Sequence, residues 1–385
     1  MQYHTLRWLI ILNILLLFIA FPASAEIMLS TGARYDMFSD DHSPKTVGYE
    51  LTVPIGLLGQ WERFAFSIDT ALSGANVLYG AGEDAELTSL TDTYFTATYA
   101  LLTAPIGISL GIDTDLPTGA ERLNANERAA EVGENHDLFE VDDFGEGFDF
   151  GVNLGLAKAF GAVSLSLNGG YRFNGEYDPT SDIEDDDYDP GDQTRIAALL
   201  KWQASTQFSL DASMAYAHFT EDKRDGSASF QEGDRLSLGE TFKLNTQIGK
   251  PMSIVFALQQ TFQAKNKALS ADGMLYTEPE NVNGSEFFGT LDLLYSYSSR
   301  CTLRMIGDIR YYGESDLQND EAGLPYDGQR IRYGFGPGVI YQPNAHIGLN
   351  GLFKYFILDQ SKDIQLPQDA TFHGANVSIG MTYTF

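Results

Sequence analysis

Apolar and small polar side chains alternate residue by residue along much of this chain. The segment 374–385 shows the pattern most clearly, with apolar residues at its odd positions and Gly, Asn, Ser or Thr at its even positions. Because successive side chains of a β-strand point to opposite faces, such a segment has one apolar and one polar face. The same alternation returns in 106–113, 163–173 and 347–357. The sequence therefore predicts an all-β fold.

Two kinds of β fold produce this alternation, a soluble sandwich and a transmembrane barrel. The polar face is rich in Gly, Ser, Thr and Asn, which suits a wet interior, and aromatic residues gather near strand ends as in the girdles of membrane barrels. The last expected strand ends on Phe385, which resembles the C-terminal signal read by the outer-membrane barrel assembly machinery. We therefore predict a transmembrane antiparallel β-barrel in the outer membrane of a Gram-negative bacterium.

About sixteen strands are expected, with about fourteen as the alternative count. Their connections alternate between short turns, expected on the periplasmic side, and long outer loops, which is typical of outer-membrane barrels. A closed sheet also satisfies every backbone polar group in lipid. The expected strands span 27–37, 47–57, 61–73, 90–102, 105–116, 147–160, 163–174, 193–205, 206–218, 235–249, 251–264, 285–298, 301–313, 329–342, 345–358 and 372–385.

The negative charge is concentrated in the expected outer loops. The net charge is −29, and the loops hold 39 of the 53 acidic residues but only 8 of the 24 basic ones. This balance excludes a nucleic-acid partner, because phosphate contact requires clustered Lys and Arg. Such loops are expected to be solvated and extended by their own repulsion. The alternative is a set of weak divalent-cation sites at Asp185, Asp186 and Asp187, which would link the loops to lipopolysaccharide phosphates.

Charged side chains of both signs fall on the polar parity of the expected strands, which predicts a wet lumen. The basic candidates for the pore lining are Arg172, Arg235, Lys243, Arg304, Arg310, Arg330 and Arg332, and the acidic ones are Asp69, Asp92, Asp113, Asp115, Asp149, Asp292 and Asp308. The arginines between 304 and 332 fall on neighbouring strands and predict a basic strip. These charges either create a transverse field that orients solutes or pair with one another as struts. The longest loop, 117–146, is expected to fold inward and narrow the channel.

One region of the chain resembles a known family. Residues 92–119 read DTYFTATYALLTAPIGISLGIDTDLPTG and end in the motif Leu116, Pro117, Thr118 and Gly119. This paired-strand unit, together with the unit 150–173, resembles the outer-membrane transporter family named for the meta-cleavage pathway of phenol degradation. The resemblance implies uptake of small, often aromatic or apolar molecules. The motif also has a physical meaning, since Pro117 stops strand pairing and Thr118-Gly119 turns the chain into the long loop.

Residues 1–25 have the form of a secretory signal peptide. Arg7 precedes an apolar stretch at 8–21, and the small residues Ala23 and Ala25 mark a cleavage site before Glu26. We expect a barrel domain at 26–385, with a transmembrane anchor at the N-terminus as the alternative. Cys301 is the only cysteine, which excludes an intramolecular disulfide and a cysteine-built zinc site.

The leading functional hypothesis is a passive channel for small solutes, with no enzymatic activity and no cofactor. A docking barrel that uses its acidic loops to bind a partner, a polymer or cations is the alternative, and the oligomeric state stays open. A third hypothesis is an outer-membrane hydrolase in which His218 meets Asp222 or Ser227. The sequence lacks the common motifs of nucleophilic and metal-dependent hydrolases, which disfavours this last reading.

Overall fold

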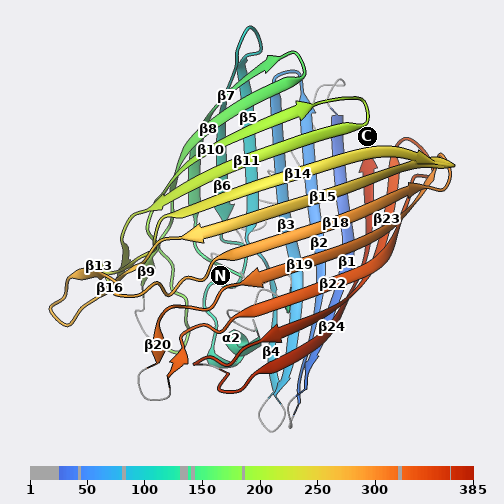
Figure 1. Ribbon diagram of the computed structural model, residues 1–385. Coiled ribbons are helices and arrows are strands. Elements are labelled where there is room, and N and C mark those ends of the chain that lie inside the picture. The colour runs from blue at the N-terminus through green and yellow to red at the C-terminus, as the bar shows by residue number, and fades with distance from the viewer. Residues whose placement is uncertain are drawn as a thin grey trace, which may run out of the picture.

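The fold is a β-barrel whose strands run obliquely around a common axis (Figure 1). The computed structural model describes residues 26–41, 45–79, 84–130, 138–139, 144–183, 187–319, 323–364 and 366–385. The expected signal peptide at 1–25 lies outside this part of the chain. Among the described residues, no helix has both the length and the apolar character that a membrane-crossing helix needs.

Sixteen antiparallel strands form the wall. Each pairs with the next wall strand along the chain, and β1 pairs with β24 to close the cylinder. A further strand, β4 (Asp84–Leu90), extends the sheet beside the outer half of β3, so it adds nothing to the circumference. The expected count of sixteen is confirmed. The wall strands are β1 (Glu26–Asp40), β2 (Thr46–Trp61), β3 (Phe64–Tyr79), β5 (Thr93–Leu102), β6 (Gly107–Leu116), β7 (Asp149–Phe160), β8 (Val163–Phe173), β10 (Gln193–Gln203), β11 (Phe208–Phe219), β14 (Arg235–Ile248), β15 (Lys250–Gln263), β18 (Glu286–Ser296), β19 (Cys301–Tyr312), β22 (Arg330–Tyr341), β23 (Ile347–Gln360) and β24 (Ala370–Thr384).

Short turns join the strands at one end of the barrel, and long loops join them at the other. The turn between β7 and β8 consists of Gly161 and Ala162, and Gly249 alone separates β14 from β15. Gly161 and Gly249 have φ of +63° and +73°, a backbone region that glycine adopts without steric cost. The alternation of short and long connections follows the sequence prediction.

Several long loops pair with one another instead of remaining extended. A five-stranded sheet stands beyond the barrel rim, and Lys223 on β12 contacts Asp189 on β9 at 2.9 Å across it. The sequence did not predict this pairing of the loops, because strands of two to five residues contain too little alternation to be recognised. The loop elements are β9 (Tyr188–Asp189), β12 (Asp222–Arg224), β13 (Ser227–Gln231), β16 (Lys267–Leu269) and β17 (Leu275–Thr277) in this sheet, the hairpin β20 (Gln318–Asn319) and β21 (Leu324–Pro325), and the helix α2 (Ala125–Ala130).

Directly paired residues show which face of the wall is outside. Tyr35 of β1 stands opposite Leu51 of β2, and these side chains are 39% and 51% exposed. The next pair, Asp36 and Glu50, is fully buried. Paired residues share a face of the sheet, so the apolar parity faces outward and the polar parity faces the lumen.

The outer face carries an apolar wall with aromatic residues toward both ends of the strands. Its only acidic residue away from a strand end, within the described wall strands, is Glu240 on β14. A wall of this kind is stable when lipid chains cover it. The outward aromatic residues include Trp61, Tyr99, Phe160, Trp202, Tyr341 and Tyr383 toward the short turns, and Phe173, Tyr216, Phe262, Tyr333 and Tyr355 toward the long loops.

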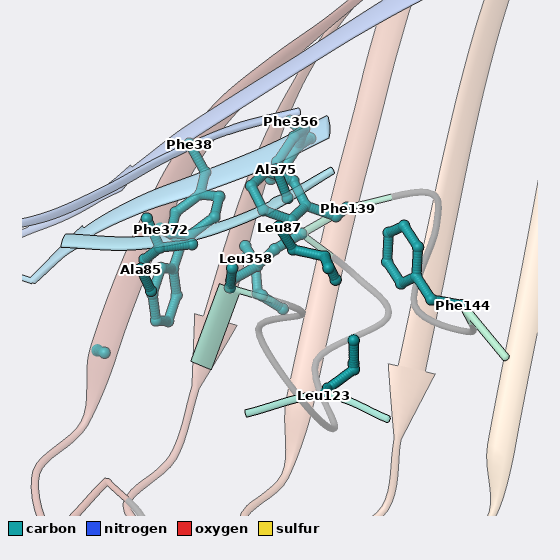
Figure 2. Close-up of a cluster of buried hydrophobic side chains, with 14 residues drawn as sticks. Phe38, Ala75, Ala85, Leu87, Leu123, Phe139, Phe144, Phe356, Leu358 and Phe372 are labelled. Atoms are coloured by element: carbon teal, nitrogen blue, oxygen red, sulfur yellow. The ribbon is translucent and has the colours of Figure 1, made fainter. Parts of the chain in front are cut away.

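The inner face holds an apolar patch near the long loops. Side chains of β1, β3, β4, β23 and β24 converge there with residues of the connection between β6 and β7 (Figure 2). We call the described residues of this connection, 117–130, 138–139 and 144–148, the inner segment. Its helix α2 lies against β4 (Figure 1). The longest connection therefore folds inward, as the sequence predicted.

Phenylalanine rings of the patch lie over glycines of the neighbouring strands. A Cβ added to Gly48 would stand 2.1 Å from the ring of Phe38, and one added to Gly374 would stand 2.1 Å from the ring of Phe356. Both phenylalanines are almost fully buried, with exposed fractions of 3% and 0%. The glycines thus provide the room in which the aromatic rings pack.

Replacing Phe356 with Ala is expected to lower the free energy of unfolding by about 3 kcal/mol, because a buried ring leaves a cavity that its neighbours fill only in part. Urea unfolding of the barrel in phospholipid vesicles measures this change. Phe353→Ala is the control, since Phe353 lies outward on the same strand and lipid chains can occupy the space that it leaves. Equal losses in the two variants would contradict the inward patch.

Candidate functional site: the barrel lumen

Arg172 on β8 lies among three carboxylates on the inner faces of β6 and β7. Its guanidinium approaches Asp149 Oδ2 at 2.5 Å and Asp113 Oδ2 at 3.6 Å, and it also contacts Asp115. Gly151 stands opposite both Asp113 and Arg172, and a Cβ there would come within 2.4 Å of the Asp113 carboxylate. Gly151 therefore makes room for a cluster in which one cation offsets several negative charges.

A second network spans the seam where the barrel closes. Asp308 on β19 contacts Lys354 Nζ at 3.0 Å and Arg332 Nη1 at 3.5 Å. Arg332 Nη2 donates to Asn376 Oδ1 at 3.4 Å, and Asn376 in turn donates to Asp36 on β1. The side chains of Asp308 and Asp36 are 2% and 0% exposed. These charges are buried and paired, so they act as struts between strands.

The four arginines of the expected basic strip do not lie together. Arg310 stands directly opposite Arg332, and Arg330 lies at the same end of β22. Arg304 lies about 20 Å from Arg310 along β19, and its guanidinium contacts Asp292 at 2.7 Å. The outer end of the lumen therefore holds three of these arginines, and the fourth is a separate strut.

Four lumen arginines lie over aromatic rings. All four pairs occupy the inner face toward the long loops. A guanidinium in this position is attracted by the ring and still presents N–H donors at its edge. Arg235 lies over Phe219 at 5.6 Å, Arg310 over Phe288 at 5.2 Å, Arg330 over Tyr312 at 4.6 Å and Arg332 over Phe356 at 4.3 Å, measured from the guanidinium carbon to the ring centroid.

The remaining candidates have different surroundings. Lys243 lies on the inner face of β14 near the short turns, and Asp69 lies on the inner face of β3. Asp92 lies between β4 and β5, where its carboxylate accepts the backbone N–H groups of Gly119 and Glu146, each at 2.9 Å. Asp92 therefore binds two backbone N–H groups of the inner segment. Its position in the alternating pattern had indicated only that it lines the pore.

The lumen is not polar throughout, in contrast to the sequence expectation. Phe38, Phe356 and Phe372 lie on the inward parity and belong to the apolar patch. The inner segment covers this patch, and two nonpolar surfaces meet there instead of facing water. The signal in the sequence was the appearance of large aromatic residues on the otherwise polar parity. Alternation alone could not locate the segment that packs against them.

The acidic loops show no metal centre in the part of the chain that the structure describes. Asp185 and Asp186 lie outside the described residues, whereas Asp187 is described. No group of three or more His, Cys, Asp or Glu residues in the described ranges is arranged to hold a metal ion. The candidate cation sites of this loop stay a prediction.

The pairing of His218 with Asp222 or Ser227, on which the disfavoured hydrolase hypothesis depended, is not the contact that His218 makes. His218 lies on the outward parity of β11, and its Nδ1 is 2.7 Å from Asp234 Oδ1. Asp222 instead accepts Tyr188 Oη at 2.6 Å and the backbone N–H of Gly191 at 2.8 Å. Loop pairing brings Asp222 to β9, so it bonds there although it follows His218 by only four residues.

The electrostatics of this rim pair are those of a structural contact. Partial burial acts to raise the pKa of Asp234, but hydrogen bonds from Tyr216 and His218 outweigh it and hold that pKa below its ordinary value. Asp234 is therefore ionised at neutral pH and serves as an acceptor. The pair lies on the outer face of the wall, away from the lumen.

Comparison with known proteins places the chain in a family. Residues 21–276 match the family described as "Putative MetA-pathway of phenol degradation". The chain belongs to this family. The matched region of the phenol-degradation family begins before β1, extends through β16 and includes the motif 116–119, while β18 to β24 lie beyond it. No curated protein sequence matches the chain.

Solved structures with a similar fold are outer-membrane proteins of low sequence identity. A bacterial polysaccharide outer membrane secretin is 9% identical, with 94% of this chain and 98% of that one covered and a TM-score of 0.46. The toluene transporter TodX of Pseudomonas putida is 10% identical, with coverages of 95% and 91% and a TM-score of 0.42. An outer membrane channel from Pseudomonas putida F1 is also 10% identical, with coverages of 95% and 97% and a TM-score of 0.38. Likeness at this level carries no statement about function.

Replacing Arg172 with Gln is expected to lower the free energy of unfolding by about 3 kcal/mol, because it leaves three lumen carboxylates without their shared cation. Urea unfolding in phospholipid vesicles is the measurement. Arg304→Gln, which leaves a single carboxylate, is expected to cost less. Adding Asp149→Asn to Arg172→Gln should recover part of the loss, and a double variant no more stable than the single one would contradict this account.

Proposed function

We propose that this protein is a passive channel of the Gram-negative outer membrane for small solutes, with aromatic compounds as the preferred class. The observation that carries the proposal is the closed wall of sixteen strands with an apolar outer face and a charged inner face. Such a cylinder in lipid is wide enough to enclose water. Membership of the phenol-degradation family supports the choice of solute. The proposal assigns the chain no catalytic step and no cofactor.

The path for solutes runs along the side of the lumen that the inner segment leaves open. The apolar patch under the inner segment is built on β1, β3, β4, β23 and β24. On the other side, Lys201 of β10 and Asp211 of β11 stand opposite each other on the inner face, with side chains 58% and 44% exposed. Their Nζ and Oδ2 atoms are 4.0 Å apart, and both side chains lie toward the short turns, so their exposure shows that water reaches the inner wall at that end of the barrel. The inner segment packs on the opposite wall toward the long loops, and we infer that it narrows the lumen at that end.

The arginine-aromatic pairs support aromatic solutes. Phe288 and Tyr312 provide ring surface on the inner wall, and Arg310 and Arg330 lie over them with donor groups at their edges. A solute that carries a ring and an oxygen, such as a phenol or an aromatic carboxylate, matches both features. A neutral sugar of similar size matches only the hydrogen-bond donors.

Replacing Arg310 with Gln is expected to reduce the flux of benzoate and phenol about tenfold relative to a pentose of similar size, because one charged hydrogen-bond donor over a ring is lost. Flux into proteoliposomes that contain the purified barrel is the measurement. Lys243→Gln removes one positive charge from the inner wall away from the aromatic pairs and is the matched control. If the unmodified protein passes no solute, the channel proposal fails. If both variants behave alike, the preference for aromatic compounds fails.

The acidic outer loops are expected to give the channel a mild cation preference that fades as salt is raised. The Debye length falls from about 10 Å at 0.1 M to about 3 Å at 1 M salt, so the loop charges act over a shorter range. Reversal potentials across a planar bilayer, measured with a salt gradient at low and at high mean concentration, report the preference. A preference that is the same at both concentrations would place its origin in the lumen instead of the loops.

A further inference from the structure

The motif 116–119 attaches the start of the inner segment to the junction of β4 and β5. Thr118 Oγ1 donates to the Thr91 carbonyl at 3.0 Å and lies 2.8 Å from Thr93 Oγ1. The next residue, Gly119, donates its backbone N–H to Asp92 Oδ1 at 2.9 Å. Pro117 lacks an N–H and ends the pairing of β6, so the chain turns inward at this point and is held there by side chains.

The end of the inner segment returns to the same carboxylate. Glu146 donates its backbone N–H to Asp92 Oδ2 at 2.9 Å. Each oxygen of Asp92 thus accepts one N–H. One comes from the beginning of the inner segment, 117–130, and one from its end, 144–148, and we call these two parts its legs. Because a carboxylate accepts such hydrogen bonds more strongly than a neutral group does, one side chain ties together positions that are far apart in the sequence.

The two legs also touch through their backbones. A Cβ on Gly119 would stand 1.3 Å from the carbonyl oxygen of Phe144, and a Cβ on Gly145 would stand 2.6 Å from that of Ala120. Neither position can hold a side chain unless the legs separate. Glycine at both places is therefore required by this close approach.

The same contact points lead directly to residues that fill the apolar patch. Leu123 follows Gly119 on the first leg and is 5% exposed, and Phe144 precedes Gly145 on the second leg and is 1% exposed. Both belong to the patch on the inner wall (Figure 2). Any separation of the legs would move these two side chains, and with them the obstruction in the lumen.

We propose that Asp92, Thr118, Gly119 and Gly145 form a clasp that holds the inner segment in the lumen and thereby sets the largest solute the channel admits. This inference rests on the proposed channel function for its second half, the size limit. In this proposal the Leu-Pro-Thr-Gly motif positions the inner segment. Its last residue must be glycine because the two legs approach so closely there. Asp92 touches no solute in this account and acts through the segment that it holds.

The test compares clasp variants with matched controls in proteoliposomes. Gly119→Ala forces the legs apart, Asp92→Asn removes one of the two acceptors, and Thr118→Val removes the hydroxyl while keeping the shape.

The controls are Gly169→Ala, where no atom lies within 4 Å of the added Cβ, and Thr96→Val, which removes a hydroxyl that bonds Ser67 on the wall at 2.9 Å. The ratio of trisaccharide to monosaccharide flux is expected to rise about tenfold in Asp92→Asn, the effect of losing a hydrogen bond to a charged group, and to rise likewise in Gly119→Ala because the legs separate. The ratio is expected to stay unchanged in the controls.

A second readout does not depend on transport. Trypsin cleavage after Arg122 and Arg128 in the folded barrel reports release of the inner segment, and it is expected to be faster in the clasp variants than in the controls. Heat modifiability in gel electrophoresis confirms that each barrel has folded. If Gly119→Ala or Asp92→Asn does not fold, Thr118→Val replaces it in both measurements. Folded clasp variants that keep both the size limit and the protease resistance of the parent would overturn the clasp. Faster cleavage in a barrel that passes no solute would retain the clasp and refute the channel.

Discussion

Backbone hydrogen bonding in lipid is the constraint on which the whole structure depends. A strand exposed to hydrocarbon must pair on both edges, because an unpaired N–H or C=O has no water to bind. The pairing of β1 with β24, from Met28 opposite Thr384 to Asp40 opposite Phe372, removes the last free edges. Once the sheet is closed, the period of two assigns every residue to lipid or to the lumen. The polar lumen is thus a consequence of closure and alternation together.

Enclosing charge within such a cylinder requires the charges to be matched locally. The structure pairs lumen cations with carboxylates on neighbouring strands, as at Arg304 with Asp292 and Arg172 with its acidic group. Small residues such as Gly151 leave room for these contacts. Arg310 and Arg330 also lie over aromatic rings, and in the proposed channel they form the part of the wall that contacts a solute. In the proposed channel, the inner segment sets how much of the lumen remains open.

The wall strands could be predicted from the sequence because the features that mark a strand depend on neighbouring residues of the chain. Alternation, turn glycines and strand lengths each depend on a few consecutive residues, and they placed all sixteen wall strands and the face of residues such as Asp292 and Asp308. Features that depend on distant residues were missed. The loop sheet requires pairing between separate loops, the contact of His218 with Asp234 depends on the register of β11 against β14, and the contact of Gly119 with Phe144 exists only when both legs of the inner segment meet. A single sequence contains the residues of such contacts but not their proximity.

Site-directed labelling along β24 tests the central claim most directly. In a Cys301→Ser background, single cysteines at consecutive positions from 377 to 383, beyond the buried residues 374–376, are given a nitroxide label in lipid vesicles. Collision rates with a water-soluble relaxing agent and with oxygen, which dissolves in lipid, are then measured. The account predicts strict alternation, with even positions reached from water and odd positions from lipid. Equal accessibility at neighbouring positions, or water contact at the odd positions, would contradict a closed barrel with a hydrated lumen.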